Sequence, residues 1–508
     1  MTSNQESYPQ SNSNPFPGLR AFKDSESHLF FGREQNISDV LAKLDKSHFV
    51  AVVGTSGTGK SSLIKAGVLP AIAAPENKQE DEEWKVISIT PGSSPMENLA
   101  RAVSQNPSLI DPSEAKDFEA NLLKLMNGNP LGLVQAMRPI LDSGQRLLIL
   151  IDQFEEVFRF SSEERAESKG GYDMFVRLII ETVRQRDVPI YAILTLRSDF
   201  LGDCVAFEGL PEAINDGHYL VPRMTKAQLK RAITGPIDFS AGKISPRLIQ
   251  HITEDLGSSA DQLPILQHAM MRCWDYWKEN EQSGDPMDIS HFEAIGDLDD
   301  ALSNHANEAY DELNATQQVT LEKVLKALTT KKADNRGVRR PMSLENLMTV
   351  TKASKDDIVS CIGPFQKPGR SFILPETSSN PPLSTIYDIS HESLMRGWHR
   401  LTIWVDEEMD SAEFYGRVCT SALLYQNGES ALWRNPDLQF ALDWKEKQAP
   451  IEAWGNLYND NFKLGIDFVE KSRSAYLLER KKKSRRTRLL RFALIVFFLV
   501  ISGLALWA

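Results

Sequence analysis

The stretch that decides the fold is HFVAVVGTSGTGKSSLIKAGVL, residues 48–69. It contains a complete GxxxxGK(S/T) pattern from Gly54 to Ser61, between an apolar run and a segment with helical spacing. In loops of this pattern, backbone N–H groups surround phosphate oxygens, the lysine reaches the β- and γ-phosphates, and the following hydroxyl binds Mg²⁺. The sequence therefore predicts a phosphate-binding loop. Its contacting residues are expected to be Gly54, Thr55, Ser56, Gly57, Thr58, Gly59, Lys60, Ser61 and Ser62.

Three further apolar runs resemble the one at 48–54. They occupy residues 84–90, 146–152 and 189–197 and are rich in Val, Ile and Leu. Runs of this kind, separated by segments long enough for crossover helices, are typical of a parallel sheet with both faces covered. We therefore expect an α/β P-loop NTPase core with a parallel sheet over residues 14–225.

Two of these runs end in side chains that suit a phosphate site. The run 146–152 ends in Asp152, the position that holds Mg²⁺ in P-loop proteins, and the run 189–197 ends in Arg197, placed to contact a γ-phosphate. Many P-loop ATPases carry an acid directly after this aspartate, but Gln153 stands here. Glu155 and Glu156 are the remaining candidates for the general base, with Glu156 preferred. Both glutamates could instead cap or solvate the next helix.

The rest of the chain divides by composition and periodicity. Apolar residues recur at helical spacing after Thr225, and a β-like pair at 371–375 and 384–390 is compatible with a winged helix. The expected segments are a disordered lead (1–13), a helical subdomain (226–305), a winged-helix-like domain (306–405) and a helical region (406–479).

The C-terminal segment combines a basic collar with an apolar run. Residues 480–491 hold eight basic and no acidic residues, and residues 492–508 carry no charge. At about 1.5 Å per residue, the apolar run spans the short end of a membrane crossing. We therefore expect a single-pass C-terminal transmembrane helix at 492–508, with the collar on the cytoplasmic side. A buried C-terminal helix is the alternative.

Composition excludes several classes of protein. The 508 residues are 41% hydrophobic and 25% charged, which excludes a mainly disordered or fibrous chain. The four cysteines form no CxxC pair, which argues against a disulfide scaffold or a zinc ribbon. The net charge of −12 argues against specific or general nucleic-acid binding.

Taken together, the motifs resemble those of bacterial novel-STAND signalling NTPases, a group often joined to WD40 repeats. The resemblance covers residues 14–405 and includes NPFPGLRAFKDSESHLFFGREQ at 14–35. It implies that Arg33 lies beside the adenine and that Pro264 of QLPILQHAM packs against the base. It also implies that His391 of ISHESLMRGW touches the β-phosphate of bound ADP.

The resemblance implies a nucleotide-dependent switch. ADP would hold the winged helix against the NTPase core, and exchange for ATP would open it and permit homo-oligomerisation, with slow hydrolysis as the reset. We expect ATP or ADP with Mg²⁺ as cofactors, an unidentified signalling partner, and an NTPase tethered to the cytoplasmic side of a bacterial inner membrane.

Two other functions remain open from the sequence. Gln153 is compatible with an ATP-binding scaffold or adaptor that hydrolyses little or nothing. A motor-type enzyme acting on DNA or peptide is the second open function. The excess of acidic residues outside 480–491 argues against DNA as its substrate. Related proteins commonly carry an effector and a repeat domain, so the sequence is expected to be either a complete tethered protein or a piece that lacks its repeats.

Overall fold

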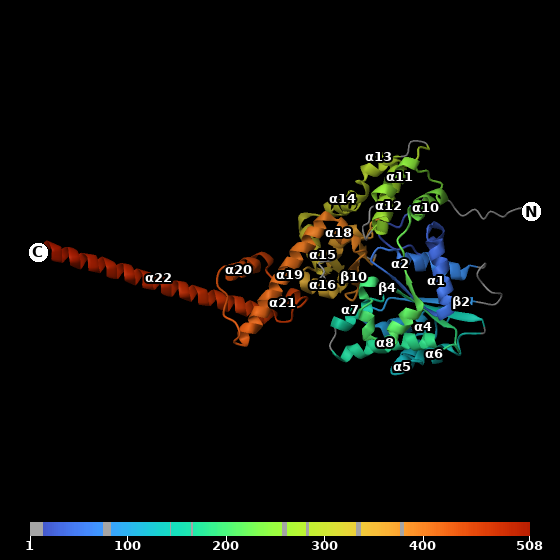
Figure 1. Cartoon of the computed structure of the whole chain (residues 1–508), viewed down its shortest axis with the longest axis horizontal. Coiled ribbons are helices and arrows are strands. Elements are labelled where there is room, and N and C mark those ends of the chain that lie inside the picture. The colour runs from blue at the N-terminus through green and yellow to red at the C-terminus, as the bar shows by residue number, and fades with distance from the viewer. Residues whose placement is uncertain are drawn as a thin grey trace, which may run out of the picture. The chain divides into compact units, whose positions relative to one another are not determined.

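The computed structural model describes residues 14–74, 83–142, 144–163, 166–256, 262–280, 284–331, 337–375 and 380–507. The chain forms two compact units. The first comprises Met1–His305 and Pro368–Ser371, and the second comprises Ala306–Lys367 and Phe372–Ala508. Figure 1 labels the elements of both units along the chain.

The first unit is built on a five-stranded parallel sheet with strand order β2-β3-β4-β1-β5. Because the strands are parallel, the loops that follow β1 and β3 and the end of β4 lie at the same edge of the sheet. The prediction of a parallel-sheet α/β core is confirmed. The strands are β1 (Phe49–Gly54), β2 (Glu83–Ile89), β3 (Gln145–Ile151), β4 (Ile190–Arg197) and β5 (His218–Leu220).

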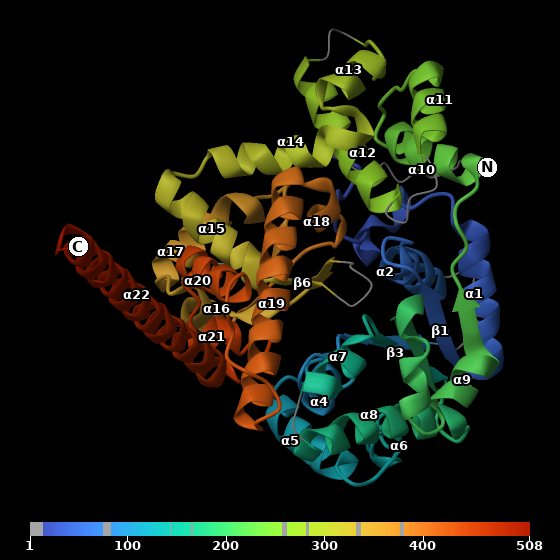
Figure 2. The same ribbon diagram turned by 60° about the vertical axis from the view of Figure 1, so that its left-hand side comes forward.

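Helices cover both faces of this sheet. Along β1, Val50 and Val52 face one hydrophobic core, whereas Ala51 and Val53 face the other. This double burial explains why the strands are almost continuously apolar. One face packs against α1 (Glu34–Ser47), η2 (Leu63–Val68) and α3 (Leu69–Ala73), and the other, seen in Figure 2, against α4 (Pro95–Ser104), α5 (Ala115–Met126), α6 (Gly132–Met137) and α8 (Ala166–Arg184).

A helical bundle completes the first unit. Its core joins Ile233, Leu266, Trp274 and Phe292, all buried. The side chain of Thr225 caps the first helix by accepting the N–H of Gln228, so the helix begins where the sequence predicted. The helices are α10 (Lys226–Phe239), α11 (Pro246–Asp255), α12 (Gln262–Asn280), α13 (Ile289–Ala294) and α14 (Asp297–Asp311), of which α14 continues into the second unit.

The second unit begins with helices and small antiparallel sheets. A three-stranded sheet has the order β8-β10-β9, and β6 pairs with β7. These elements fit a winged helix, which stays a prediction together with the domain boundaries. The elements are α15 (Ala315–Ala327), β6 (Thr329–Lys331), β7 (Gly337–Arg339), β8 (Met342–Ser343), α16 (Leu344–Thr351), α17 (Lys355–Gln366), β9 (Ile373–Leu374) and β10 (Ile386–Ile389).

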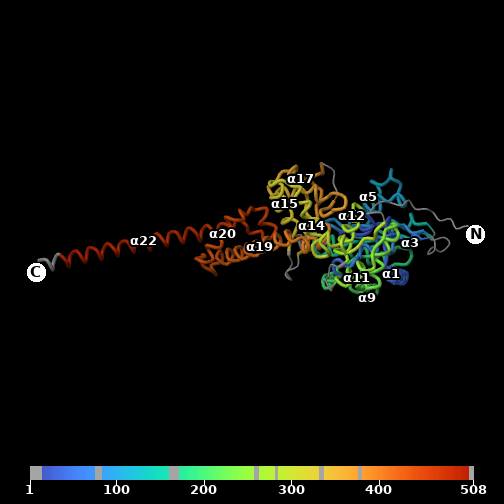
Figure 3. The backbone as a smooth tube through the Cα atoms, turned by 90° about the horizontal axis from the view of Figure 1, so that it is seen from above, coloured from blue at the N-terminus to red at the C-terminus, as the bar shows by residue number. Residues whose placement is uncertain are grey.

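The remainder of the second unit is helical. Helix α19 packs against the first part of α22, as the tube in Figure 3 also shows. The buried carboxylate of Glu408 on α19 accepts hydrogen bonds from the Trp454 indole at 2.6 Å and the Tyr458 hydroxyl at 2.8 Å. The helices are α18 (Ser393–Gly397), α19 (His399–Gln426), α20 (Asp437–Gln448), α21 (Glu452–Gly455) and α22 (Phe462–Trp507).

The prediction of a C-terminal transmembrane helix at 492–508 is wrong. Within the described residues, no helix has the length and apolar character needed to cross a membrane. The apolar run is the end of α22, which also carries the basic collar, and side chains are described only up to residue 502. The 18 residues that end there still contain Arg485, Arg486, Arg488 and Arg491, and such charges are costly in hydrocarbon. The expected membrane anchor, tethering and inner-membrane location depended on this helix and are withdrawn with it.

Candidate functional site

The loop between β1 and α2 (Lys60–Ser62) is compact because two of its glycines take conformations that other residues rarely adopt. Gly57 and Gly59 have φ angles of 78° and 83°, in the left-handed region. A Cβ atom on Gly54 would lie 2.7 Å from the hydroxyl oxygen of Thr58, so the packing there leaves no room for a side chain. Thr55 at the loop tip is exposed, and Ser56 is half-buried. This backbone can turn its N–H groups toward one centre, as an anion site requires.

Lys60 lies across the same loop. Its ammonium group donates to the backbone oxygens of Gly54 and Thr55, each at 2.9 Å. Burial lowers the pKa of Lys60, Glu155 acts to raise it, and Arg197 lowers it further. All three residues follow or end parallel strands, so they belong to the same carboxyl edge of the sheet.

Asp152 directly follows β3 and is buried beside the loop. Its Oδ1 accepts the Ser61 hydroxyl at 2.8 Å and the Thr195 hydroxyl at 2.7 Å, and its Oδ2 lies 2.6 Å from the Lys65 ammonium. Burial alone would raise the pKa of Asp152, but Lys65 and the two hydroxyls outweigh it and lower the pKa. The structure thus brings a carboxylate held in its ionised form against the serine of the phosphate loop.

The two candidate bases point to different places. Glu155 is buried, and its carboxylate accepts the backbone N–H of Arg197 at 3.4 Å. Burial raises the pKa of Glu155, while Lys60 and Arg197 act to lower it. Glu156 begins α7 (Glu156–Glu163), and its carboxylate accepts the Gly92 N–H at 2.9 Å. Glu155 therefore contacts the end of β4 and Glu156 contacts the loop after β2, and the choice of the general base stays a prediction.

Arg197 ends β4 at the same edge. Its guanidinium donates to both carboxylate oxygens of Asp199, at 3.1 and 2.9 Å, and lies over the ring of Phe200. The Arg197 side chain is 13% exposed and that of Asp199 is 31% exposed, so this ion pair remains partly open to water. Arg197 therefore ends its strand with a side chain paired to Asp199, and its contact with a γ-phosphate stays a prediction.

Arg33 links the phosphate loop to the segment that follows β5. It is buried, and it donates to the backbone oxygens of Thr58 at 3.2 Å and Pro222 at 2.7 Å. Nothing described tests its expected contact with adenine, which stays a prediction. Its position beside the loop is nevertheless fixed by contacts with two separate segments.

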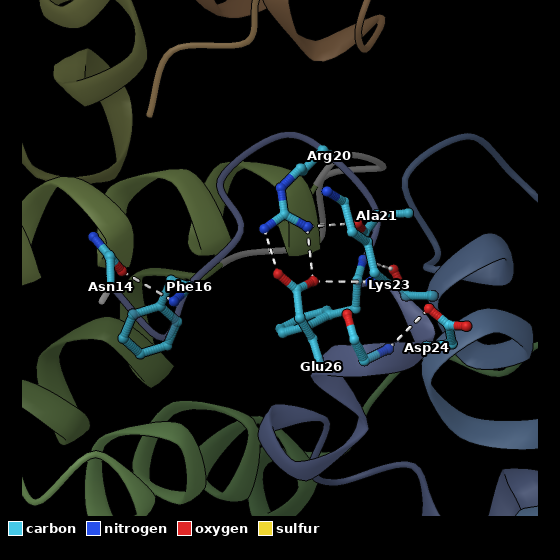
Figure 4. Close-up of polar contacts among 10 residues, drawn as sticks. Asn14, Phe16, Arg20, Ala21, Lys23, Asp24 and Glu26 are labelled. Carbon is cyan, nitrogen blue, oxygen red and sulfur yellow. Dashed lines mark hydrogen bonds and ion pairs between the residues drawn. The ribbon is translucent and has the colours of Figure 1, made fainter. Parts of the chain in front are cut away.

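The N-terminal segment that leads to Arg33 contacts both α12 and α2, the short helix that follows the phosphate loop. Asn14 donates to the backbone oxygen of Met271 at 2.7 Å, and the backbone N–H of Phe22 donates to the Ser62 hydroxyl at 3.2 Å. Between them, Arg20 forms a bidentate ion pair with Glu26, shown in Figure 4. The segment therefore connects the helical bundle to the residue that follows Ser61.

Pro264 and His391 lie in different units. Pro264 is in the first turn of α12, whose Leu263 comes within 3.6 Å of a Cβ placed on Gly59, so this helix start approaches the loop. His391 belongs to the second unit. Its Nδ1 accepts the backbone N–H of Ser393 at 3.1 Å, at the start of α18. The predicted phosphate contact of His391 remains a prediction.

A family model described as Novel STAND NTPase 1 matches residues 15–431. The chain belongs to this family. It is therefore a nucleotide-binding P-loop NTPase. A bacterial origin and a fusion to WD40 repeats stay predictions.

Solved structures similar to this Novel STAND NTPase 1 chain resemble it remotely. The ORC2 protein of Aeropyrum pernix, solved as ADPNP–ADP complexes, is 13% identical with a TM-score of 0.41, covering 79% of this chain and 97% of that one. The Walker-type ATPase paby2304 of Pyrococcus abyssi is 13% identical with a TM-score of 0.37, covering 75% and 98%. UvrABC system protein A of Streptococcus pneumoniae is 41% identical over 58 residues, so this chain spans 6% of that protein's length.

The described residues of this Novel STAND NTPase 1 chain fit a magnesium–phosphate complex better than a site made of protein ligands alone. Across the described parts of the chain, no group of three or more His, Cys, Asp or Glu side chains could hold a metal. Mg²⁺ in nucleotide sites uses one or two protein oxygens together with phosphate and water. Ser61 and Asp152 supply such a pair at 2.8 Å from each other.

Two contacting residues were missed by sequence reasoning. Lys65 reaches Asp152, and the Thr195 hydroxyl links Asp152 to the backbone N–H of Gln153 at 2.9 Å. The position of Thr195, two residues before Arg197 on the same strand, was an available signal. No comparable signal in the sequence distinguishes Lys65 from a surface lysine of the loop helix.

Proposed function

We propose that this chain is a slow regulatory ATPase that works as a nucleotide-dependent signalling switch. One observation carries the proposal: Asp152 accepts the hydroxyl of Ser61 in the phosphate loop, while the buried Glu155 accepts the backbone N–H of Arg197 at the same edge of the sheet. A site that holds anions, a metal-binding carboxylate and a separate buried acid has the parts that phosphoryl transfer to water needs.

Each residue has a defined role in this proposal. Lys60 and the loop N–H groups hold the β- and γ-phosphates, and Arg197 stabilises charge on the γ-phosphate. Ser61 and Asp152 would hold Mg²⁺, which would offset the negative charge of the phosphates. Glu155 accepts a proton from the attacking water. Its burial raises its pKa toward the working pH, which suits a general base.

The switch role rests on the division of the chain. Nucleotide can shift an equilibrium between conformations only through contacts that differ between them. In the proposal, the first unit supplies the phosphate contacts and His391 of the second unit supplies a contact specific to ADP. ATP would then favour a homo-oligomer that engages the signalling partner.

A second candidate is an ATP-binding scaffold that does not hydrolyse. Gln153 occupies the position where many ATPases carry their base, and its amide cannot accept a proton from water at neutral pH. If Glu155 remains protonated, nucleotide would bind without turnover.

Nucleotide binding and phosphate release by the full chain separate these candidates. We expect K60A to abolish both, and E155Q to keep binding while release falls about 100-fold or more. E156Q is the matched control, because Glu156 contacts Gly92, and its release should stay within about threefold of wild type. Binding without release in the wild type would favour the scaffold, and equal losses in E155Q and E156Q would contradict the role of Glu155.

A further inference from the structure

Lys65 makes a contact that the proposed reaction does not use. It lies in η2, the π-helical turn Leu63–Val68 that directly follows α2. Its ammonium nitrogen is 2.6 Å from Asp152 Oδ2, and the Asp152 side chain is 4% exposed. The other oxygen, Oδ1, accepts the Ser61 and Thr195 hydroxyls. Both carboxylate oxygens therefore have donors, and one donor is a full positive charge.

The local fold explains why this lysine reaches the carboxylate. Lys65 follows Ser61 by four residues, a spacing that places two side chains on the same face of a helix. Every residue of the π turn is buried except Lys65. Such wide turns often occur at functional sites. The apolar residues of the turn thus fix it against the sheet and leave Lys65 directed toward the phosphate site.

The charge of Lys65 is suited to a metal-free site. An ionised carboxylate in a buried position is unstable without a countercharge, and it would repel a polyphosphate bound nearby. Lys60 is directed to the loop carbonyls of Gly54 and Thr55 and not to Asp152. Lys65 neutralises Asp152 directly.

We propose that Lys65 is a built-in countercation for Asp152, which competes with Mg²⁺ for this carboxylate and lets the site hold nucleotide without the metal. The proposal rests on the proposed function only in taking adenine nucleotide as the ligand. Lys65 acts through Asp152, so it is a positioning residue. Its contribution is expected to appear in the coupling between metal and nucleotide binding.

The test measures the dissociation constant for ADP by calorimetry, with the full chain, in EDTA and in Mg²⁺. In K65M, Asp152 loses its countercharge, so affinity in EDTA should fall while affinity in Mg²⁺ holds or rises. We expect the ratio of the two dissociation constants to grow at least about fivefold, the lower end of measured coupling between sites. K65R keeps the charge and should restore the wild-type ratio. K46M removes an exposed lysine of α1 and should leave the ratio unchanged.

A double-mutant cycle keeps the test informative if K65M is unstable. In a D152N background the carboxylate charge is absent, so K65M should no longer change the ratio. An unchanged ratio in K65M, or an equal effect of K65M with and without D152N, would overturn the proposal while leaving nucleotide binding intact. If wild type binds ADP in neither condition, the proposed function itself fails.

Discussion

Thr195 joins two functional parts of the phosphate site. Its hydroxyl donates to Asp152 Oδ1 at 2.7 Å, and its oxygen accepts the N–H of Gln153 at 2.9 Å. Gln153 has a φ of 58°, a left-handed conformation that costs a non-glycine residue roughly 1–2 kcal/mol. One buried side chain therefore orients Asp152 and stabilises the turn that leads to Glu155.

Replacing this hydroxyl with a methyl group should destabilise the first unit. T195V keeps the shape of the side chain but leaves a buried N–H and a carboxylate oxygen short of a partner, which costs about 1–3 kcal/mol. The thermal unfolding midpoint should fall accordingly. T195S keeps the hydroxyl and should retain most of the stability. Equal midpoints for the two variants would show that the hydrogen bonds contribute little.

At the scale of elements, the N-terminal segment packs closely on α10. Gly32 has a φ of 85°, and a Cβ there would lie 2.5 Å from the backbone oxygen of Gln228. A neighbouring close approach brings Phe31 within 2.4 Å of a Cβ placed on Gly235. The backbones of this segment and of α10 are therefore in direct contact, and that contact fixes the start of α1 and Arg33 beside the loop.

This packing predicts different costs for two glycine substitutions. Gly128 has a φ of 79°, close to that of Gly32, but nothing lies within 4 Å of its missing side chain. G128A should therefore cost only the conformational energy, about 1–2 kcal/mol. G32A should cost clearly more in the free energy of unfolding, because the α10 backbone must move. Urea unfolding of both variants measures the two losses in the free energy of unfolding. A similar loss in each would mean that the N-terminal segment accommodates the added methyl group without a shift of the α10 backbone.

The strands could be predicted because both of their faces are buried. An apolar run such as 146–152 then identifies a strand without any knowledge of its neighbours. Lys60, Ser61 and Asp152 could be located for the same reason, since the ends of parallel strands meet at one edge. The family resemblance added the N-terminal segment.

Features that depend on local backbone geometry could not be predicted in this way. Glu155 and Glu156 follow a residue with a positive φ, Gln153, and the spacing of acids does not reveal which contacts each of them makes. Lys65 lies in a π-helical turn, and the sequence pattern does not reveal that turn. The transmembrane prediction counted the apolar residues of 492–508 apart from the basic helix that they extend.

At the scale of the whole molecule, the chain crosses between its two units more than once, and two residues of the first unit lie at these crossings. His305 is the last residue before one crossing, and Arg370 lies in the short segment Pro368–Ser371 that belongs to the first unit. The ring of His305 on α14 is 3.1 Å from that of His268 on α12, and both are buried. Burial lowers the pKa of His268 to about 3, with Arg272 adding to the effect. Burial also strongly lowers the pKa of His305, with smaller contributions from His268, Arg272 and Arg370.

This pair should make the protein sensitive to mild acid. Both histidines have folded-state pKa values below the unfolded value of about 6.5, so the unfolded chain binds more protons as pH falls below that value. Stability is then fully present above about pH 6.5 and declines below it, by roughly 1.4 kcal/mol per pH unit for each histidine. Between pH 7 and pH 5, wild type should lose about 2 kcal/mol more than H305Q. H218Q removes an exposed histidine and should follow wild type, because His218 is not part of the buried pair. If thermal unfolding midpoints show the same pH dependence for wild type and H305Q, the buried histidine pair does not cause the predicted loss of stability in mild acid.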